Sequence, residues 1–278
     1  MTVITHRNPQ DTGPTLARLI ELAAEAGVTL RCDEEETRKH GLTARPGLEV
    51  DAPIKDGVEL CVVLGGDGTI LRALQRYART GVPVFAVDFG EIGFLATVER
   101  SELEDGLLRA LQGDFELLPL PGIVLDGPGG DQPGINDVAI HRKVGERVAE
   151  IAYALDDEVI GSVRCDGLVI ATPAGSTGYN LANGGPVMAW GVEGCVVSFI
   201  APHSLTARAL VVAPKDRLTI HNRSRDPLEI AVDGRIVGEL APGDTVGARF
   251  EDAVGTIAQL PGSSFYRRLR EKFGSLAS

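Results

Sequence analysis

The sequence predicts an α/β domain followed by an all-β domain within its 278 residues. Over residues 1–114, apolar runs typical of strands alternate with stretches whose apolar residues recur at helical spacing, and this alternation indicates a parallel sheet. Over residues 115–254, short β segments are separated by Gly, Pro and Asp turns, which favours an all-β domain. Residues 255–278 are expected to form a C-terminal helix that packs back on the first domain.

The first domain is expected to contain four short strands rich in apolar or β-branched residues. These strands are predicted at residues 3–5, 28–32, 59–64 and 82–87. Helices are predicted at residues 13–26, 33–40 and 71–79, and a loop at residues 46–55. A further helix is expected to run through Leu103 and Leu111 after a cap at Ser101, because acidic residues fill its first turn.

The second domain is expected to consist of strands joined by tight turns. They are predicted at residues 115–125, 137–141, 149–155, 159–163, 168–171, 195–200, 218–221, 228–232 and 245–250. Within the tail, residues 265–273 have the spacing of an amphipathic basic helix.

The overall charge excludes some classes of partner. With 27 basic and 39 acidic residues the net charge is −12, so a nucleic acid is not expected to bind, although a local site can still hold a small phosphorylated ligand. The four cysteines are far apart in sequence, which predicts neither a CxxC metal site nor a disulfide scaffold and fits the reducing cytoplasm. Neither a signal peptide nor an apolar run of membrane-spanning length is found, so we expect a cytoplasmic protein without a membrane partner.

A Gly-rich turn at residues 65–69 follows the predicted buried strand 59–64 and precedes a helix. Such a turn lets backbone N–H groups at a helix N-terminus approach a phosphate. Its carboxylate, Asp67, suits a site that also holds a metal or takes a proton from a hydroxyl. The alternative is a tight connection in which Asp67 or Thr69 only caps the helix.

Four further stretches are polar or glycine-rich where a plain β domain would not need them. They are residues 136–137, 164–180, 184–186 and 202–208. Asn136 and Asp137 could equally form a simple turn pair. Tyr179 could stack on a flat ring or donate a hydrogen bond, or belong to a long turn leading into a helix. His203 is a candidate for catalysis, but a lone histidine in a turn is more often structural.

Taken together and in order, these stretches resemble the bacterial NAD kinases over roughly residues 60–215. The matching motifs are Gly-Gly-Asp-Gly-Thr at 65–69, Asn-Asp at 136–137, Asp-Gly at 166–167, Thr-Pro-Ala-Gly-Ser-Thr-Gly-Tyr at 172–179, Gly-Gly-Pro at 184–186 and Pro-His-Ser-Leu at 202–205. The first motif also occurs in lipid kinases and phosphofructokinases, whereas the segment from 166 to 186 is much more specific.

The resemblance implies an enzyme that moves the terminal phosphate of ATP, or of polyphosphate, onto the 2′-hydroxyl of the adenosine ribose of NAD to make NADP. It implies an N-terminal α/β domain, a C-terminal β-sandwich with NAD between the two, and a homodimer or homotetramer. Mg²⁺ or another divalent metal would bridge the ATP oxygens, and we expect no metal site made by protein ligands alone.

The resemblance also assigns residues. Asp67 matches the proton acceptor, and the residues implied to contact NAD are Asp67, Gly68, Asn136, Asp137, Arg147, Arg164, Asp166, Thr177, Gly178, Tyr179, Asn180, Leu181 and Ala182. The phosphate-binding residues expected from the turn are Gly65, Gly66, Gly68 and Thr69.

Two departures and two rival functions remain open. Asp88 stands where the family usually has Asn, and Gly178 stands before the motif tyrosine, so the preference for NAD or NADH and the phosphate donor are not fixed by the sequence. One rival is a lipid or sugar kinase that shares only the Gly-rich turn, which leaves residues 136–137 and 172–179 unexplained. The other is a non-catalytic dinucleotide-binding regulator, which would have no need of Asp67.

Overall fold

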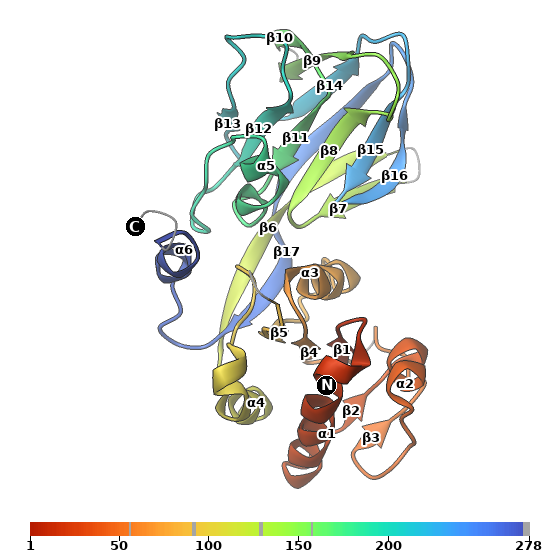
Figure 1. Ribbon diagram of the computed structural model, residues 1–278, viewed down its shortest axis with the longest axis vertical. Coiled ribbons are helices and arrows are strands. Elements are labelled where there is room, and N and C mark those ends of the chain that lie inside the picture. Colours follow the sequence, from red (N-terminus) through yellow and green to blue (C-terminus); the bar gives the residue numbers. More distant parts are fainter. Residues whose placement is uncertain (56, 91–92, 128–129, 157, 275–278) are drawn as a thin grey trace. The chain divides into compact units, whose positions relative to one another are not determined.

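The computed structural model describes residues 1–55, 57–90, 93–127, 130–156 and 158–274 (Figure 1). The chain divides into two compact units, the first made of Met1–Pro119 and Gly255–Ser278 and the second of Leu120–Val254. Two long strands, β6 (Glu116–Gly127) and β17 (Thr245–Gln259), have residues in both units. In the described ranges, no helix is both long and apolar enough to cross a membrane.

The first unit is built on a parallel sheet, as predicted. Its strands are β1 (Thr2–Thr5), β2 (Leu30–Arg31), β3 (Leu48–Glu49), β4 (Cys61–Leu64) and β5 (Val84–Val87). They lie in the order β5-β4-β1-β2-β3, and the end of β17 pairs in parallel with β5 through Ile257 and Val84. Every residue of β1, β4 and β5 is buried, as expected for strands inside an α/β unit.

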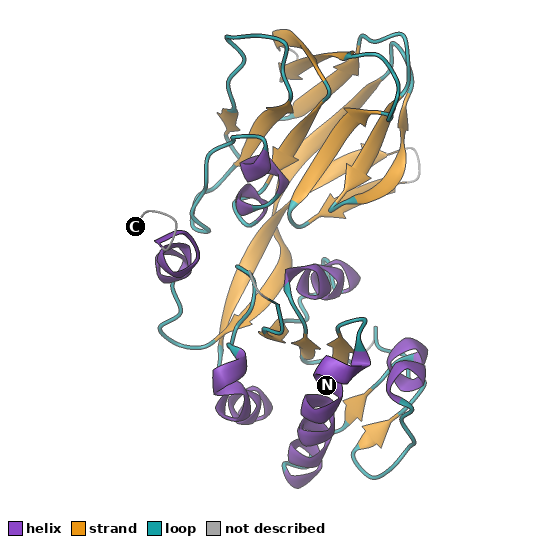
Figure 2. Ribbon diagram, in the orientation of Figure 1, coloured by secondary structure: helices purple, strands orange, loops and turns teal. Residues whose placement is uncertain are grey.

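The helices of the first unit are drawn in purple in Figure 2, and side chains cap the first two in chain order. They are α1 (Pro9–Glu25), α2 (Glu34–His40), α3 (Asp67–Arg76), η1 (Arg100–Glu102), α4 (Leu103–Gln112) and α6 (Phe265–Phe273). Asn8 caps α1 by accepting from the N–H of Gln10, and Pro9 fits the first turn, so α1 starts before the predicted residue 13. Asp33 caps α2 by accepting from the N–H of Glu36.

Four further local predictions for the first unit need correction. The helix predicted at 71–79 begins earlier and ends earlier, at Asp67 and Arg76. Ser101 does not cap α4, because it lies inside the 3-10 turn η1, where the N–H of Glu102 donates to the carbonyl of Glu99. The expected loop at 46–55 contains the two-residue strand β3. The tail is not one helix over 255–278. Gly255–Gln259 continue β17, α6 begins after Pro261 and two serines, and residues 275–278 lie outside the described part of the chain.

The second unit is an antiparallel β-sandwich. One sheet contains β13 (Leu210–Val212), β12 (Cys195–Ile200), β11 (Gly167–Ala171), β8 (Asp137–Arg142), β15 (Leu228–Val232) and β16 (Arg235–Leu240), in that order. The other contains β10 (Glu158–Cys165), β9 (Ala149–Leu155), β14 (Leu218–Asn222), β17 and β6, with β7 (Gly130–Gly134) paired to β6. The predicted all-β domain is therefore confirmed.

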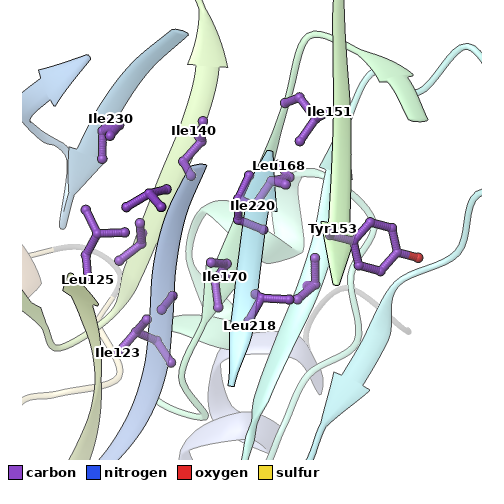
Figure 3. Close-up of a cluster of buried hydrophobic side chains, with 14 of the residues drawn as sticks. Ile123, Leu125, Ile140, Ile151, Tyr153, Leu168, Ile170, Leu218, Ile220 and Ile230 are labelled. Carbon is purple, nitrogen blue, oxygen red and sulfur yellow. The ribbon is translucent and has the colours of Figure 1, made fainter. Parts of the chain in front are cut away.

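The core of the second unit lies between these sheets (Figure 3). Ile140, Leu168 and Ile230 come from the first sheet, and Ile151 and Ile220 from the second, and all five belong to one buried cluster. Alternate residues point the other way, so Ala139, Val169 and Val196 form a separate cluster with Met188 on the opposite face of the first sheet. The short helices η2 (Gly175–Thr177) and α5 (Tyr179–Ala182) lie beside that opposite face. Met188 of the cluster connects to η2, since its main-chain oxygen accepts a hydrogen bond from the hydroxyl of Ser176.

Candidate functional site

The Gly-rich turn of the first unit lies at the carboxyl end of β4, where α3 begins. The N–H groups of Thr69 and Ile70 donate to the carbonyl of Gly66 at 2.8 and 3.1 Å. Gly65 has no space for a side chain, since an added Cβ would lie 2.7 Å from Oγ1 of Thr69. The turn therefore exposes the helix N-terminus at Gly66 and Gly68 in a form that suits a phosphate.

Asp67 does not cap α3, and no other side chain does either, so the capping alternative is wrong. Its Oδ2 accepts from the N–H of Phe94 at 2.9 Å, and its Oδ1 accepts from the N–H of Leu95 at 3.1 Å. Burial raises the pKa of this carboxyl group, the two N–H donors oppose the rise, Asp88 adds to it and Arg268 opposes it. A carboxylate with a raised pKa and a fixed orientation is suited to accept a proton.

Asp88 lies at the carboxyl end of β5, the strand next to β4, and its Oδ1 accepts from the N–H of Gly90 at 2.7 Å. The point that a Cβ of Gly93 would occupy is 2.7 Å from Oδ1 of Asp67 and 3.3 Å from Oδ2 of Asp88. Because residue 93 is a glycine, the carboxylates of Asp67 and Asp88 can both approach the space that a side chain at this position would fill. The described residues contain no group of three or more His, Cys, Asp or Glu side chains able to hold a metal.

In the second unit, the predicted pair Asn136 and Asp137 stands where β8 begins. The carboxylate of Asp233 accepts from the N–H groups of Ile135, Asn136 and Asp137 at 2.9, 2.7 and 3.1 Å. Asp233 was not predicted, and the signal that could have found it is the Asp-Gly turn between the β15 and β16 segments. By accepting these three hydrogen bonds, Asp233 fixes the backbone of Asn136 and Asp137, so a rigid segment holds both side chains.

Asp137 is 7% exposed, and burial together with the charge of Asp233 raises its pKa to about 7. The side-chain oxygen of Asn136 is also buried, and among the described residues it has no hydrogen-bond partner. A buried polar oxygen without a partner usually indicates a missing water or ligand. These two groups could accept hydrogen bonds from sugar hydroxyls.

The loop at residues 172–182, which contains the motif predicted at 172–179, lies directly against Asn136. The N–H of Thr172 donates to the carbonyl of Asn136 at 2.9 Å, and the hydroxyl of Thr172 donates to the carbonyl of Ile135 at 2.7 Å. Within the loop, Nδ2 of Asn180 donates to the carbonyls of Ser176 and Pro186 at 2.9 and 3.0 Å. The structure thus joins the Asn-Asp pair, the Thr- and Gly-rich loop and the Gly-Gly-Pro segment into one local site.

Tyr179 starts α5 and is 41% exposed. Partial burial raises the pKa of its phenol, and the nearby carboxylates of Asp137 and Asp166 raise it further. Its neighbours in the loop are the partly buried Thr177 and Leu181 and the exposed Gly178 and Ala182. The exposed ring next to two carboxylates could stack on a base while acidic groups bind hydroxyls.

Asp166 forms a two-point ion pair with Arg142, from Nε to Oδ1 at 2.6 Å and from Nη2 to Oδ2 at 3.1 Å. This hydrogen-bonded pair lowers the pKa of Asp166. Arg142 was not predicted, because nothing local in the sequence links it to Asp166. Arg147 and Arg164 are exposed, and across the described ranges no hydrogen bond joins their side chains to the rest of this site.

The chain matches two family models. Residues 16–115 match the ATP-NAD kinase N-terminal domain, and residues 135–250 match the ATP-NAD kinase C-terminal domain. It is 33% identical over 281 residues to an NAD kinase of Gemmatimonas aurantiaca, with 98% of this chain and 94% of that protein covered. An NAD kinase of Symbiobacterium thermophilum is 35% identical over 239 residues, with 84% of both chains covered.

Two solved structures share the fold. A yeast NADH kinase complexed with NADH superposes with a TM-score of 0.88 at 22% identity, over 100% of this chain and 88% of that one. An NAD kinase from Archaeoglobus fulgidus in complex with ATP superposes with a TM-score of 0.71 at 22% identity, over 99% and 98% of the two chains. The two family models and the sequence relatives, which cover most of both chains, show that this chain belongs to the NAD kinase family.

Proposed function

We propose that this member of the NAD kinase family transfers the terminal phosphate of ATP to the 2′-hydroxyl of the adenosine ribose of NAD and makes NADP. The observation that carries the proposal is the carboxylate of Asp67, which stands in a phosphate-binding turn with a raised pKa and two N–H donors that fix its orientation. A lipid or sugar kinase would not need the buried pair Asn136 and Asp137 or the loop packed against it.

In the proposed reaction, Asp67 takes the proton of the 2′-hydroxyl as its oxygen bonds to the terminal phosphorus. The bond from that phosphorus to the bridging oxygen breaks, and ADP leaves with the electron pair. A ribose hydroxyl is a poor nucleophile, so a positioned base is expected to contribute roughly 10²–10⁴-fold to the rate. Backbone N–H groups of Gly66 and Gly68 would hold the phosphate, with Gly65 and Thr69 shaping the turn.

Apart from Asp67 and Gly68 of the turn, the residues proposed to contact NAD belong to the second unit. The buried oxygens of Asn136 and Asp137 would bind ribose hydroxyls, and Asp166 would contact the nicotinamide side. The adenine would lie against residues 177–182, with Tyr179 as the stacking ring. Arg147 and Arg164 are proposed to neutralise the phosphates of NAD, because both are exposed cations.

A divalent metal is proposed to arrive with the phosphate donor. Mg²⁺ prefers oxygen ligands and keeps several waters, so it needs only one or two carboxylates from the protein. The carboxylate of Asp88, whose Oδ2 lies 3.3 Å from the point that a Cβ of Gly93 would occupy, fits this requirement, while Asp67 acts as the base. When bound, the metal would neutralise charge on the transferred phosphate.

The cellular form is proposed to be a cytoplasmic homo-oligomer, a dimer or a tetramer. Exposed apolar side chains support self-association, with Val159, Leu205 and Val211 being 53%, 95% and 53% exposed in the second unit. The four buried, free cysteines fit a reducing compartment. Light scattering during gel filtration would measure the oligomeric state, and a monomer at micromolar concentration would contradict this proposal.

The decisive experiment is a coupled assay of NADP formation by the purified protein, run in parallel with ATP and with polyphosphate, and with NAD and with NADH. We expect NADP from NAD and ATP, dependent on Mg²⁺ and abolished by excess chelator. Absence of product with every donor, together with measurable NAD binding by calorimetry, would instead favour the non-catalytic regulator.

A further inference from the structure

One peptide group of the first unit lies between a cation and the proposed base. The carbonyl of Phe94 accepts from Nη1 of Arg268 at 2.6 Å. The N–H of Leu95, which belongs to the same peptide group, donates to Oδ1 of Asp67 at 3.1 Å. The N–H of Phe94 donates to the other carboxylate oxygen at 2.9 Å. The guanidinium of Arg268 is therefore linked to the Asp67 carboxylate through a single amide.

This link depends on α6, which is more than 170 residues away from Phe94 in the sequence. The ring of Phe94 is 7% exposed and packs against the ring of Phe273, with a centroid separation of 5.7 Å and an interplanar angle of 35°. Arg268 also lines a cleft that contains Asp88 and Gly93. Two residues of α6, one on each side of the helix centre, thus hold the segment that orients Asp67.

The charges around this link oppose one another. Asp67 is near Asp88, which raises its pKa, and near Arg268, which lowers it. Arg268 is near Asp67, Glu271 and Asp88, and partial burial lowers its pKa more than these carboxylates raise it. Arg268 thus places a positive charge near the carboxylates of Asp67 and Asp88.

We propose that Arg268 is a positioning residue for Asp67, which polarises the peptide group between Phe94 and Leu95 and thereby holds the carboxylate in its productive orientation. Donation to a carbonyl oxygen makes the N–H of the same amide a stronger donor, so the hydrogen bond from Leu95 to Asp67 strengthens. The C-terminal helix is in this way part of the catalytic arrangement without touching substrate. The inference rests on the proposed role of Asp67 as base.

The test uses the full chain with Arg268→Gln and Arg268→Lys. Gln removes the charge, whereas Lys keeps the charge but offers a point donor instead of a planar fork. Arg270→Gln, an exposed arginine of the same helix, is the matched control for loss of one positive charge. Thermal denaturation identifies which variants fold.

For Arg268→Gln we expect kcat to fall roughly 10- to 100-fold, because small displacements of a reacting group are costly. KM for NAD should stay within about twofold, since the proposed NAD-facing residues other than those of the turn belong to the second unit. The acid limb of the kcat profile should move to higher pH, because Asp67 loses a stabilising cation and a strong N–H donor. Arg268→Lys should lie between wild type and Arg268→Gln, and Arg270→Gln should match wild type.

A merely structural role would lower the amount of folded enzyme and leave the acid limb in place, and that outcome overturns the proposal. If Arg268→Gln does not fold, kcat and the acid limb of its pH profile are compared between Arg268→Lys and Arg270→Gln, and the same outcomes support or overturn the proposal. A ¹³C NMR titration of the Asp67 carboxyl group, assigned with Asp67→Asn, gives the answer without any activity. An inactive wild type would therefore defeat the proposed function, whereas an unmoved Asp67 titration in the Arg268 variants would defeat this inference alone.

Discussion

The carbonyl oxygen of Asn136 lies 2.0 Å from the position that a Cβ atom at Gly175 would occupy. The carbonyl carbon and Cα of Asn136 would be only 2.4 and 2.7 Å from the same point. These are backbone atoms of a segment that is fixed by Asp233 and Thr172, so they cannot yield as a flexible side chain could. The close approach of the two backbones is what joins the loop at 172–182 to the pair at 136–137.

The first prediction is that Gly175→Ala damages the proposed NAD site and the fold of the second unit together. Overpacking of this kind typically costs about 1–3 kcal/mol, which should appear as a lower melting temperature. NAD affinity, measured by calorimetry, should fall as well. Gly191→Ala is the control, because an added Cβ there meets nothing within 4 Å. Unchanged melting and NAD affinity in Gly175→Ala would show that the loop can move away from Asn136 without consequence.

The second prediction concerns pH and Asp137, whose pKa is raised to about 7 in the folded protein. An aspartate in an unfolded chain has a pKa of about 3.9. The folded state therefore binds this proton more tightly than the unfolded chain does. The stability that Asp137 contributes is fully present below the pKa of the unfolded chain, and it is lost as the pH rises through about 7. Asp137→Asn stays neutral, so its melting temperature relative to wild type should rise between pH 5 and pH 7 and then level off.

Thermal denaturation of both proteins across that pH range checks the sign. Asp252→Asn, an exposed aspartate of the same unit, controls for the loss of one negative charge. A difference between Asp137→Asn and wild type that stays constant from pH 5 to pH 8 contradicts the expectation. NAD binding by the wild type should also tighten as pH rises through this range, if the ionised carboxylate accepts from a ribose hydroxyl.

The third prediction is that Tyr179→Ala weakens NAD binding more than it slows the chemical step. Loss of an aromatic ring that stacks on a base costs about 1–3 kcal/mol, or at least roughly a fivefold increase in KM when binding is at equilibrium. Tyr179→Phe keeps the ring and removes the hydroxyl, so it should retain most of the affinity. An unchanged KM with a collapsed kcat in Tyr179→Ala would place the ring near the reacting groups instead.

Much of the fold followed from sequence because the deciding signals are local. The buried β-branched run of β4, the glycines after it and the amphipathic α3 are all visible within one short stretch. The strands missed in the second unit were β7, β13 and β16. β7 has the sequence Gly-Asp-Gln-Pro-Gly, and β13 and β16 are the edge strands of their sheet, with little of the periodicity that burial imposes.

The site was predictable only in part, for a similar reason. Asn136, Asp137 and Tyr179 carry motif signals, but the groups that hold them come from other elements. Asp233 reaches Asn136 only through the pairing of β15 with β8, and Arg142 reaches Asp166 only through the pairing of β8 with β11. Such partners depend on strand order, which a single sequence does not display.

The last prediction replaces the proposed base in Asp67→Asn. The amide can accept the N–H of either Phe94 or Leu95 but not of both, and its own NH₂ group then faces the second donor. This mismatch should cost about 1–3 kcal/mol of stability.

If Asp67 takes the proton, kcat should fall by roughly 10²–10⁴ while NAD still binds. If it mainly orders a metal on the phosphates, high Mg²⁺ should restore the rate. The measurement is therefore kcat across a magnesium titration, with NAD affinity from calorimetry and melting temperature followed separately. Near wild-type turnover would remove Asp67 from the chemistry, and recovery at high Mg²⁺ would make it a metal-organising residue instead of the base.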